Sequence, residues 1–274
     1  MEKLKFEART LDEDIVKDGL CAVSALEDSP VSRQMAFVVG GVATQSYLPS
    51  LYRRPTSDID LAVMKPLSYA EFKCFSNEAV QCLQDHRYAV RLSKGHNSYG
   101  LTFYNPSNGD AAIIEFARRN AQNFARIEAR LGRELRNARN KVLEERGATY
   151  IVSSPEDIVV PKIVRGIGTL KRHLEFFEQL PSDNLLPLTS ENIAENLRRI
   201  KRLRDEAVIH IGSPELSERL RFESDIYDIN SLSRITGFNL DYLKESMKDW
   251  SILNERSREN MKLVGYLFPH FQVE

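Results

Sequence analysis

The sequence is poor in the residues that build disulfide frameworks and zinc centres. It has three cysteines, Cys21, Cys74 and Cys82, so their number is odd and no Cys-x-x-Cys motif is present. This usage favours buried free thiols in a cytoplasmic protein. The five histidines are scattered, without the spacing of a zinc site or of a nucleophile and its base.

Long apolar runs and an excess of one charge sign are also missing. No apolar stretch approaches ~18 residues, which argues against a membrane-spanning helix, and the charged start MEKLKFEARTLDEDIV lacks the apolar core of a signal peptide. Lys and Arg number 38 and Asp and Glu 39, for a net charge of −1. We therefore expect a cytoplasmic protein without a membrane partner, in which only a local basic patch could bind nucleic acid.

What is present is enough apolar sequence for two domains, since 42% of the 274 residues are hydrophobic. Apolar patterns predict strands over 35–39, 58–63, 87–93, 98–104, 111–116 and 149–152. They predict helices over 11–26, 42–50, 68–84 and, as one long Arg-rich helix, 118–146. After the helix start at Ser154-Pro155 only helices follow, over 155–180, 190–211, 214–223, 239–248 and 250–266. We predict an α+β protein with a mixed-sheet domain over 1–153 and a helical bundle over 154–274.

Two aspartates, Asp58 and Asp60, interrupt an apolar strand. Residues two apart on a strand point to the same face, so the carboxylates repel and one pKa rises unless a cation lies between them. Mg²⁺, or Mn²⁺, is suited to such oxygen ligands and keeps other positions for water and phosphate. A solvated strand end is the alternative for an isolated Asp-x-Asp, so the neighbouring residues decide.

The neighbours of this pair are of the types that bind phosphate. Gly40 and Gly41 end a strand before a predicted helix, where bare amides could hold a phosphate, although an ordinary tight turn has the same sequence. Thr56 and Ser57 supply hydroxyls. Arg54 could meet phosphate oxygens or lie solvated in its loop.

Together, the Gly-Gly turn and the Asp-apolar-Asp strand resemble the signature of the nucleotidyltransferase superfamily with the DNA polymerase β-like fold. The residues Arg54, Thr56, Asp58 and Asp60 match the Arg-x-Thr-x-Asp-x-Asp stretch of its AbiEii-type toxin group. The resemblance implies a minimal nucleotidyltransferase sheet and a third carboxylate on a neighbouring strand. Glu115, inside an apolar strand, is favoured for it over Asp110, which starts that strand beside a turn.

A second similarity begins at Ser154, because AbiEii-like proteins carry a similar Ser-Pro-Glu-Asp helix start with a later lysine. By this resemblance Lys162 would neutralise the triphosphate, whereas the residues alone favour a packed stem with a solvated ammonium. These toxins usually continue with an Arg-Asp-x-x-Asp-Leu helix. The nearest text is 202–207, where Asp205 has no second Asp and is better explained as an exposed helical acid.

The resemblance implies transfer of a nucleoside monophosphate from an NTP to an acceptor hydroxyl. Asp58, Asp60 and Glu115 would hold Mg²⁺ or Mn²⁺, while the glycines and Thr56 would lie along the triphosphate. The acceptor could be RNA, such as the 3′ end of tRNA, with an antitoxin protein as a partner. The Arg-rich segment 118–146 favours RNA, the neutral overall charge favours a small-molecule acceptor, and a degenerate member that binds without turnover is the third reading.

Overall fold

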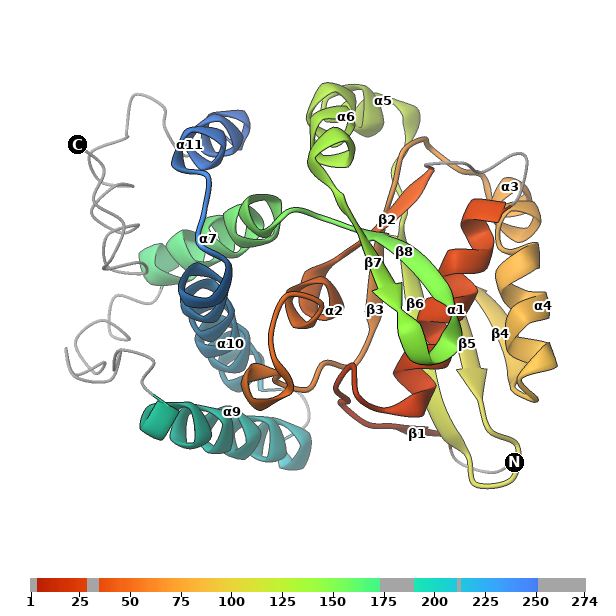
Figure 1. Cartoon of the computed structure of the whole chain (residues 1–274), viewed down its shortest axis with the longest axis horizontal. Coiled ribbons are helices and arrows are strands. Elements are labelled where there is room, and N and C mark those ends of the chain that lie inside the picture. The colour runs from red at the N-terminus through yellow and green to blue at the C-terminus, as the bar shows by residue number, and fades with distance from the viewer. Residues whose placement is uncertain (1–3, 29–34, 173–189, 211–212, 251–274) are drawn as a thin grey trace. The chain divides into compact units, whose positions relative to one another are not determined.

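The computed structural model describes residues 4–28, 35–172, 190–210 and 213–250 (Figure 1). The chain divides into two compact units, Met1–Ser154 and Pro155–Glu274. This division falls one residue after the predicted boundary. The first unit holds every described strand, and the described elements of the second are all helices, so the α+β class is confirmed.

The first unit is built on an eight-stranded mixed sheet. Seven strands follow the order β4-β5-β6-β3-β2-β8-β7, and β1 pairs with β6. The strands are β1 Lys5–Phe6, β2 Ala36–Val39, β3 Ile59–Val63, β4 Ala89–Lys94, β5 Ser98–Tyr104, β6 Asp110–Ala117, β7 Arg139–Leu143 and β8 Ala148–Val152. β3 and β6 run parallel, as do β2 and β8, whereas β4, β5 and β6 form an antiparallel meander. The path therefore ends on β4 and β7.

Helices cover both faces of this sheet. They are α1 Asp14–Asp28, α2 Gly40–Gln45, α3 Tyr69–Phe75, α4 Asn77–Asp85, α5 Ala121–Ala125 and α6 Glu128–Asn137. α1 meets one face, because a side chain at its Gly19 would press on Ile59 and Phe103. On the other face, Phe124 of α5 and Leu131 of α6 form a buried cluster with the sheet residues Phe37 and Ala62, which are register partners.

Local signals predicted much of this unit. The hairpin of β4 and β5 is confirmed, and so is the capping box in which Ser68 accepts from the Glu71 amide while Glu71 accepts from the Ser68 amide. The helix predicted over 68–84 is divided at Ser76, which ends α3 and precedes α4.

The long helix predicted over 118–146 is wrong. This segment forms α5, α6, β7 and a short 3₁₀ turn over Glu144–Arg146. The helix ends at Ala138, whose backbone is extended (φ −62°, ψ 154°), and residues 139–143 then pair with β8 along its whole length. Long-range strand pairing thus overrides a helical charge pattern, because propensity is a weak prior against tertiary contacts.

The described part of the second unit consists of α7 Pro155–Arg172, α9 Ser190–Ile209, α10 Pro214–Thr236 and α11 Leu240–Asp249. α10 packs against α7 and α9, and α11 packs against α7. α10 runs well past its predicted end at residue 223. The helix predicted over 250–266 and the end of the one predicted over 155–180 lie outside the described residues. No described helix combines the length and apolar composition that a bilayer crossing requires.

The cysteines are free thiols, but their burial differs from the expectation. Cys21 is buried, Cys82 is half-buried and Cys74 is exposed. Burial, with a smaller contribution from nearby Cys82, raises the pKa of Cys21 to about 11. The prediction of buried thiols is therefore correct for Cys21 and wrong for Cys74.

Phe37 is the anchor of the cluster under α5 and α6, and it is 0% exposed. We expect Phe37→Ala to lower the free energy of unfolding by about 3–5 kcal/mol, because it removes transfer energy and leaves a cavity. Val142, on the sheet edge and 65% exposed, provides the control, since Val142→Ala should change stability by less than about 0.5 kcal/mol. Urea unfolding measures both, and equal effects would contradict the assigned core.

Candidate active site

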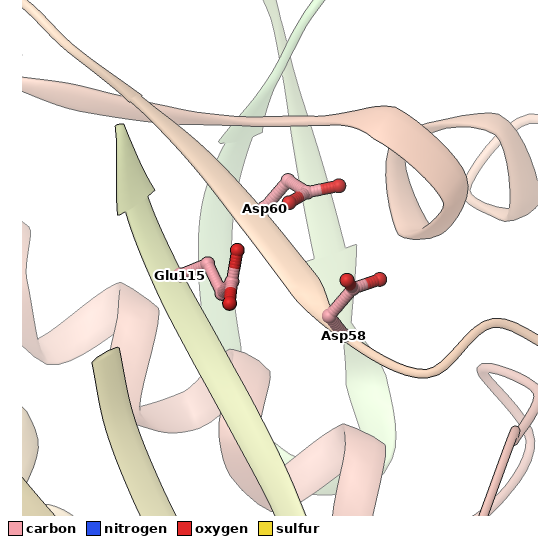
Figure 2. A group of neighbouring side chains, drawn as sticks. All are labelled: Asp58, Asp60 and Glu115. Atoms are coloured by element: carbon pink, nitrogen blue, oxygen red, sulfur yellow. The ribbon is translucent and has the colours of Figure 1, made fainter. Parts of the chain in front are cut away.

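Three carboxylates gather on one face of the sheet, beside β3. Asp58, just before β3, Asp60 within it and Glu115 on β6 each offer an oxygen, and these oxygens all lie within 4.8 Å of one another (Figure 2). All three residues are partly buried. The two aspartates therefore share a side of the strand, as their spacing predicts.

The parallel pairing of β3 with β6 brings Glu115 to this group. Asp60 and Glu115 are register partners, and their flanking pairs Ile59–Ile114 and Leu61–Phe116 are buried. Asp110, the alternative third carboxylate, instead forms an ion pair with Arg9 at the start of β6. Of the two acids weighed from the sequence, Glu115 is thus the one that the fold places beside Asp58 and Asp60.

The two glycines that follow β2 lie in close contact with Asp60 and Thr56. Val39, the last residue of β2, is the register partner of Asp60, and α2 begins directly after it. Gly40 has φ +72°, and a Cβ at this position would collide with Oδ2 of Asp60. A Cβ on Gly41 would lie 2.5 Å from Oγ1 of Thr56. Both positions therefore require glycine, one for its φ and both for the close approach.

The remaining residues predicted for the site lie in the loop that leads into β3. The Thr56 hydroxyl donates to Oδ1 of Asp58 over 3.3 Å. Thr56, Ser57 and Asp58 also line a small pocket together with Arg9. Arg54 is half-buried and its guanidinium donates to the Pro55 carbonyl over 3.4 Å.

The electrostatics of the carboxylate group suit a divalent cation. Burial, and then the charge of Asp58, raise the pKa of Glu115 above its ordinary value. Three oxygen ligands within a few ångströms are the donor set that Mg²⁺ or Mn²⁺ prefers. The three carboxylates stay partly exposed, so the donor set present fits a metal ion.

Lys162 belongs to the second unit, where it is buried (3% exposed) on α7. Its ammonium donates to Asp228 over 2.8 Å and to Asp225 over 3.4 Å, both on α10. Arg165 also donates to Asp225, over 2.9 and 3.0 Å. The expected solvated ammonium is therefore wrong, and the function of Lys162 at a triphosphate stays a prediction.

Sequence reasoning missed the two partners of Lys162. Asp225 and Asp228 lie in the run Ser-Asp-Ile-Tyr-Asp-Ile over 224–229. They have the Asp-x-x-Asp spacing that the resemblance implies and that residues 202–207 lack. The signal was two acids on one helical face among apolar neighbours. Asp205 is exposed, as expected for an ordinary helical acid.

The acids of the Ser-Pro-Glu-Asp helix start also have a structural function. Glu156 accepts from the backbone amide of Asn239 over 2.7 Å, and Asp157 accepts from the hydroxyls of Tyr242 and Ser246 over 2.7 and 3.1 Å. Both acids are buried. They attach the start of α11 to the start of α7.

No protein-family model matches this chain, and no curated protein matches it. Among solved structures, the chain is similar to an antigenic nucleotidyltransferase-like protein from Paracoccidioides brasiliensis, at 16% identity and a TM-score of 0.40. That match covers 93% of this chain and 98% of the other. The fold and the site together define an α+β protein with a three-carboxylate group beside a glycine turn.

We expect Mg²⁺ or Mn²⁺ to raise the thermal midpoint at neutral pH and Glu115→Gln to remove most of this shift. The metal effect should fade as the pH falls through the raised pKa of Glu115, which is above the ordinary 4.5, because protonation removes a ligand. Without metal, a raised pKa stabilises the folded state below the ordinary pKa, and this contribution is lost as pH rises. Without metal, the stability of Glu115→Gln relative to wild type should therefore rise with pH. An equal shift of the thermal midpoint by metal in both proteins would contradict the site.

Lys162→Met should lower the free energy of unfolding by about 3–5 kcal/mol, because it leaves buried carboxylates without their cation. Lys248, exposed on α11, gives the matched control, and Lys248→Met should cost less than about 0.5 kcal/mol. Denaturant unfolding monitored by circular dichroism checks both. If Lys162→Met left the free energy of unfolding unchanged, the ion pairs of Lys162 would add nothing to the stability of the second unit.

Proposed function

We propose that this protein is a metal-dependent nucleotidyltransferase that transfers a nucleoside monophosphate from an NTP to an acceptor hydroxyl and releases pyrophosphate. The observation that carries the proposal is the group of Asp58, Asp60 and Glu115, with oxygens within 4.8 Å of one another. Like charges at this separation repel unless a cation joins them. The glycine pair, which lies against Asp60 and Thr56, supplies open backbone amides beside the same point.

Each residue of the group has a separate function in this proposal. Asp58 and Asp60 hold the metal, and Glu115 completes its ligands or accepts the proton of the acceptor hydroxyl. The bound metal would neutralise phosphate charge and align the attacking oxygen. Gly40 and Gly41 position the triphosphate, so that catalysis consists mainly of orientation and electrostatic stabilisation.

Four further residues contribute to nucleotide binding. Thr56, through its contact with Asp58, fixes the orientation of that carboxylate, while Ser57 and Arg54 offer a hydroxyl and a guanidinium to phosphate oxygens. Lys162 would add positive charge towards the triphosphate when its carboxylate partners release it.

For the acceptor we propose RNA, such as the 3′ end of tRNA, with an antitoxin protein as a cognate partner. Support comes from the cations Arg126, Arg136 and Arg139, which are exposed just after α5, on α6 and on β7 and could meet phosphates. Their segment is no longer the single helical face that the sequence predicted.

A small-molecule acceptor is the second candidate, favoured by the net charge of −1. Incubation with Mg²⁺, labelled NTPs, total RNA and candidate small hydroxyl compounds separates the two. Label on RNA supports the first candidate and label on a small compound supports the second. Calorimetric NTP binding without pyrophosphate release would point instead to a non-catalytic member.

Asp58→Asn and Asp60→Asn should each lower the rate of nucleotide transfer by at least about 10³-fold, because each removes a metal ligand and its charge. Their thermal midpoints without metal should be unchanged or higher, since the repulsion falls. Pyrophosphate release measures the rate. Asp205→Asn, an exposed acid in the second unit, is the matched control and should leave both quantities unchanged.

A large loss of stability in both aspartate variants would identify them as structural residues. Full activity in either variant would contradict the proposed metal ligands. Measuring folding and turnover on the same preparations keeps these two outcomes separate.

A further inference from the structure

Three arginines and one glutamate, each buried or half-buried, lie on α6 and just after β6. Arg133 and Glu134, on α6, are 9% and 7% exposed, and the Arg130 side chain is 15% exposed, with Nε 3.4 Å from Oε1 of Glu134. Arg119, just after β6, is half-buried. We call these four residues the arginine cluster. It contains three guanidinium groups and one carboxylate.

Arg119 is the member whose charge is least well balanced. Its charged neighbours are Arg130, which repels it, and Glu134, which attracts it; burial and Arg130 lower its pKa. Nη1 of Arg119 is buried and has no hydrogen-bond partner among the described residues. A buried cationic donor without a partner is costly, and an anion at this point would satisfy it.

The arginine cluster lies on the same sheet face as the three carboxylates. Val39, the register partner of Asp60, packs against the hydrophobic cluster that α5 and α6 form on this face. Alternation along β6 puts Glu115 and Ala117 on one side, and Arg119 follows two residues later, against α6. The Cα of Arg119 is at most roughly 13 Å from that of Glu115, at ~3.3 Å per residue.

The arginine cluster and the glycine pair lie at opposite ends of the carboxylate site. α2 begins where β2 ends, beside Asp60, whereas α5 and α6 cover Phe37 and Ala62, towards the other end of this strand pair. A triphosphate held by Gly40 and Gly41 therefore occupies one side of the carboxylates. The arginine cluster is left for a second anionic group.

We infer that the arginine cluster is a phosphate-binding site for the acceptor, with Arg119 as its principal donor. The planar guanidinium fork matches two phosphate oxygens, and a phosphate oxygen would satisfy the buried Nη1 of Arg119. The inference rests on the proposed function and specifies its substrate class: an acceptor with a phosphodiester near its reacting hydroxyl, as in a polynucleotide. An NTP phosphate has the same chemistry, and the experiment separates the two sources.

The test uses the full-length protein with Arg119→Gln, Arg119→Lys and the control Arg91→Gln, an exposed arginine of the edge strand β4. A fluorescent single-stranded oligoribonucleotide is titrated without NTP, and Mg²⁺–NTP binding is measured by calorimetry. Arg119→Gln should weaken RNA binding by roughly 10- to 100-fold and lower the slope of log affinity against log salt by about 0.7. Mg²⁺–NTP affinity should not change, and Arg91→Gln should match wild type.

Arg119→Lys keeps the charge but loses the fork, so its RNA affinity should lie between those of wild type and Arg119→Gln. It also tests the site if Arg119→Gln fails to fold, which the thermal midpoint reveals. RNA affinity unchanged in both variants overturns the inference, and so does a loss of NTP affinity instead of RNA affinity.

These binding measurements need no turnover, so the two proposals can fail separately. If RNA binding depends on Arg119 but no acceptor is labelled, the proposed transferase function fails while the phosphate site stands. If RNA is labelled by wild type and by Arg119→Gln with equal KM for RNA, the transferase function stands and the phosphate site fails.

Discussion

Repulsion among three carboxylates is the constraint on which the first unit depends. The parallel register of β3 and β6 holds Asp60 beside Glu115, and the buried residues on either side prevent the strands from slipping. A one-residue slip would turn every side chain of the strand to the other face. The hydrophobic packing of these strands therefore offsets the repulsion between the acids and holds them together.

The two units treat buried acids in opposite ways. In the second unit, Asp225 and Asp228 are almost fully buried, and Lys162 and Arg165 lie against them as cations. In the first unit, the carboxylate group stays partly exposed and Glu115 has a raised pKa. The arrangement in the second unit is typical of a structural ion pair, because its charges are already balanced. The arrangement in the first unit is typical of a site that an external cation completes.

The sequence predicted the grouping of the carboxylates where short-range signals agree. Asp58 and Asp60 interrupt an apolar strand, so period-2 alternation predicts that they share a face, whereas Glu115 was assigned to their group through the family resemblance. Prediction from local sequence failed for residues 139–143, whose strand is formed by pairing with β8 rather than by local propensity. The partners of Lys162 were missed for a related reason, since Asp225 is more than sixty residues away and only the fold brings it to α7.

The charged strands at the two ends of the sheet have a consequence for the protein in a crowded solution. β4 carries Arg91 and Lys94, and β7 carries Arg139 and Lys141, the last with its ammonium 4.0 Å from the centre of the Tyr47 ring. Cations on terminal strands discourage a strand of another molecule from adding to the sheet. A chain with a net charge of −1 has little charge repulsion between its molecules. These four cations are therefore expected to oppose strand pairing between sheet edges, the step from which fibrils would grow.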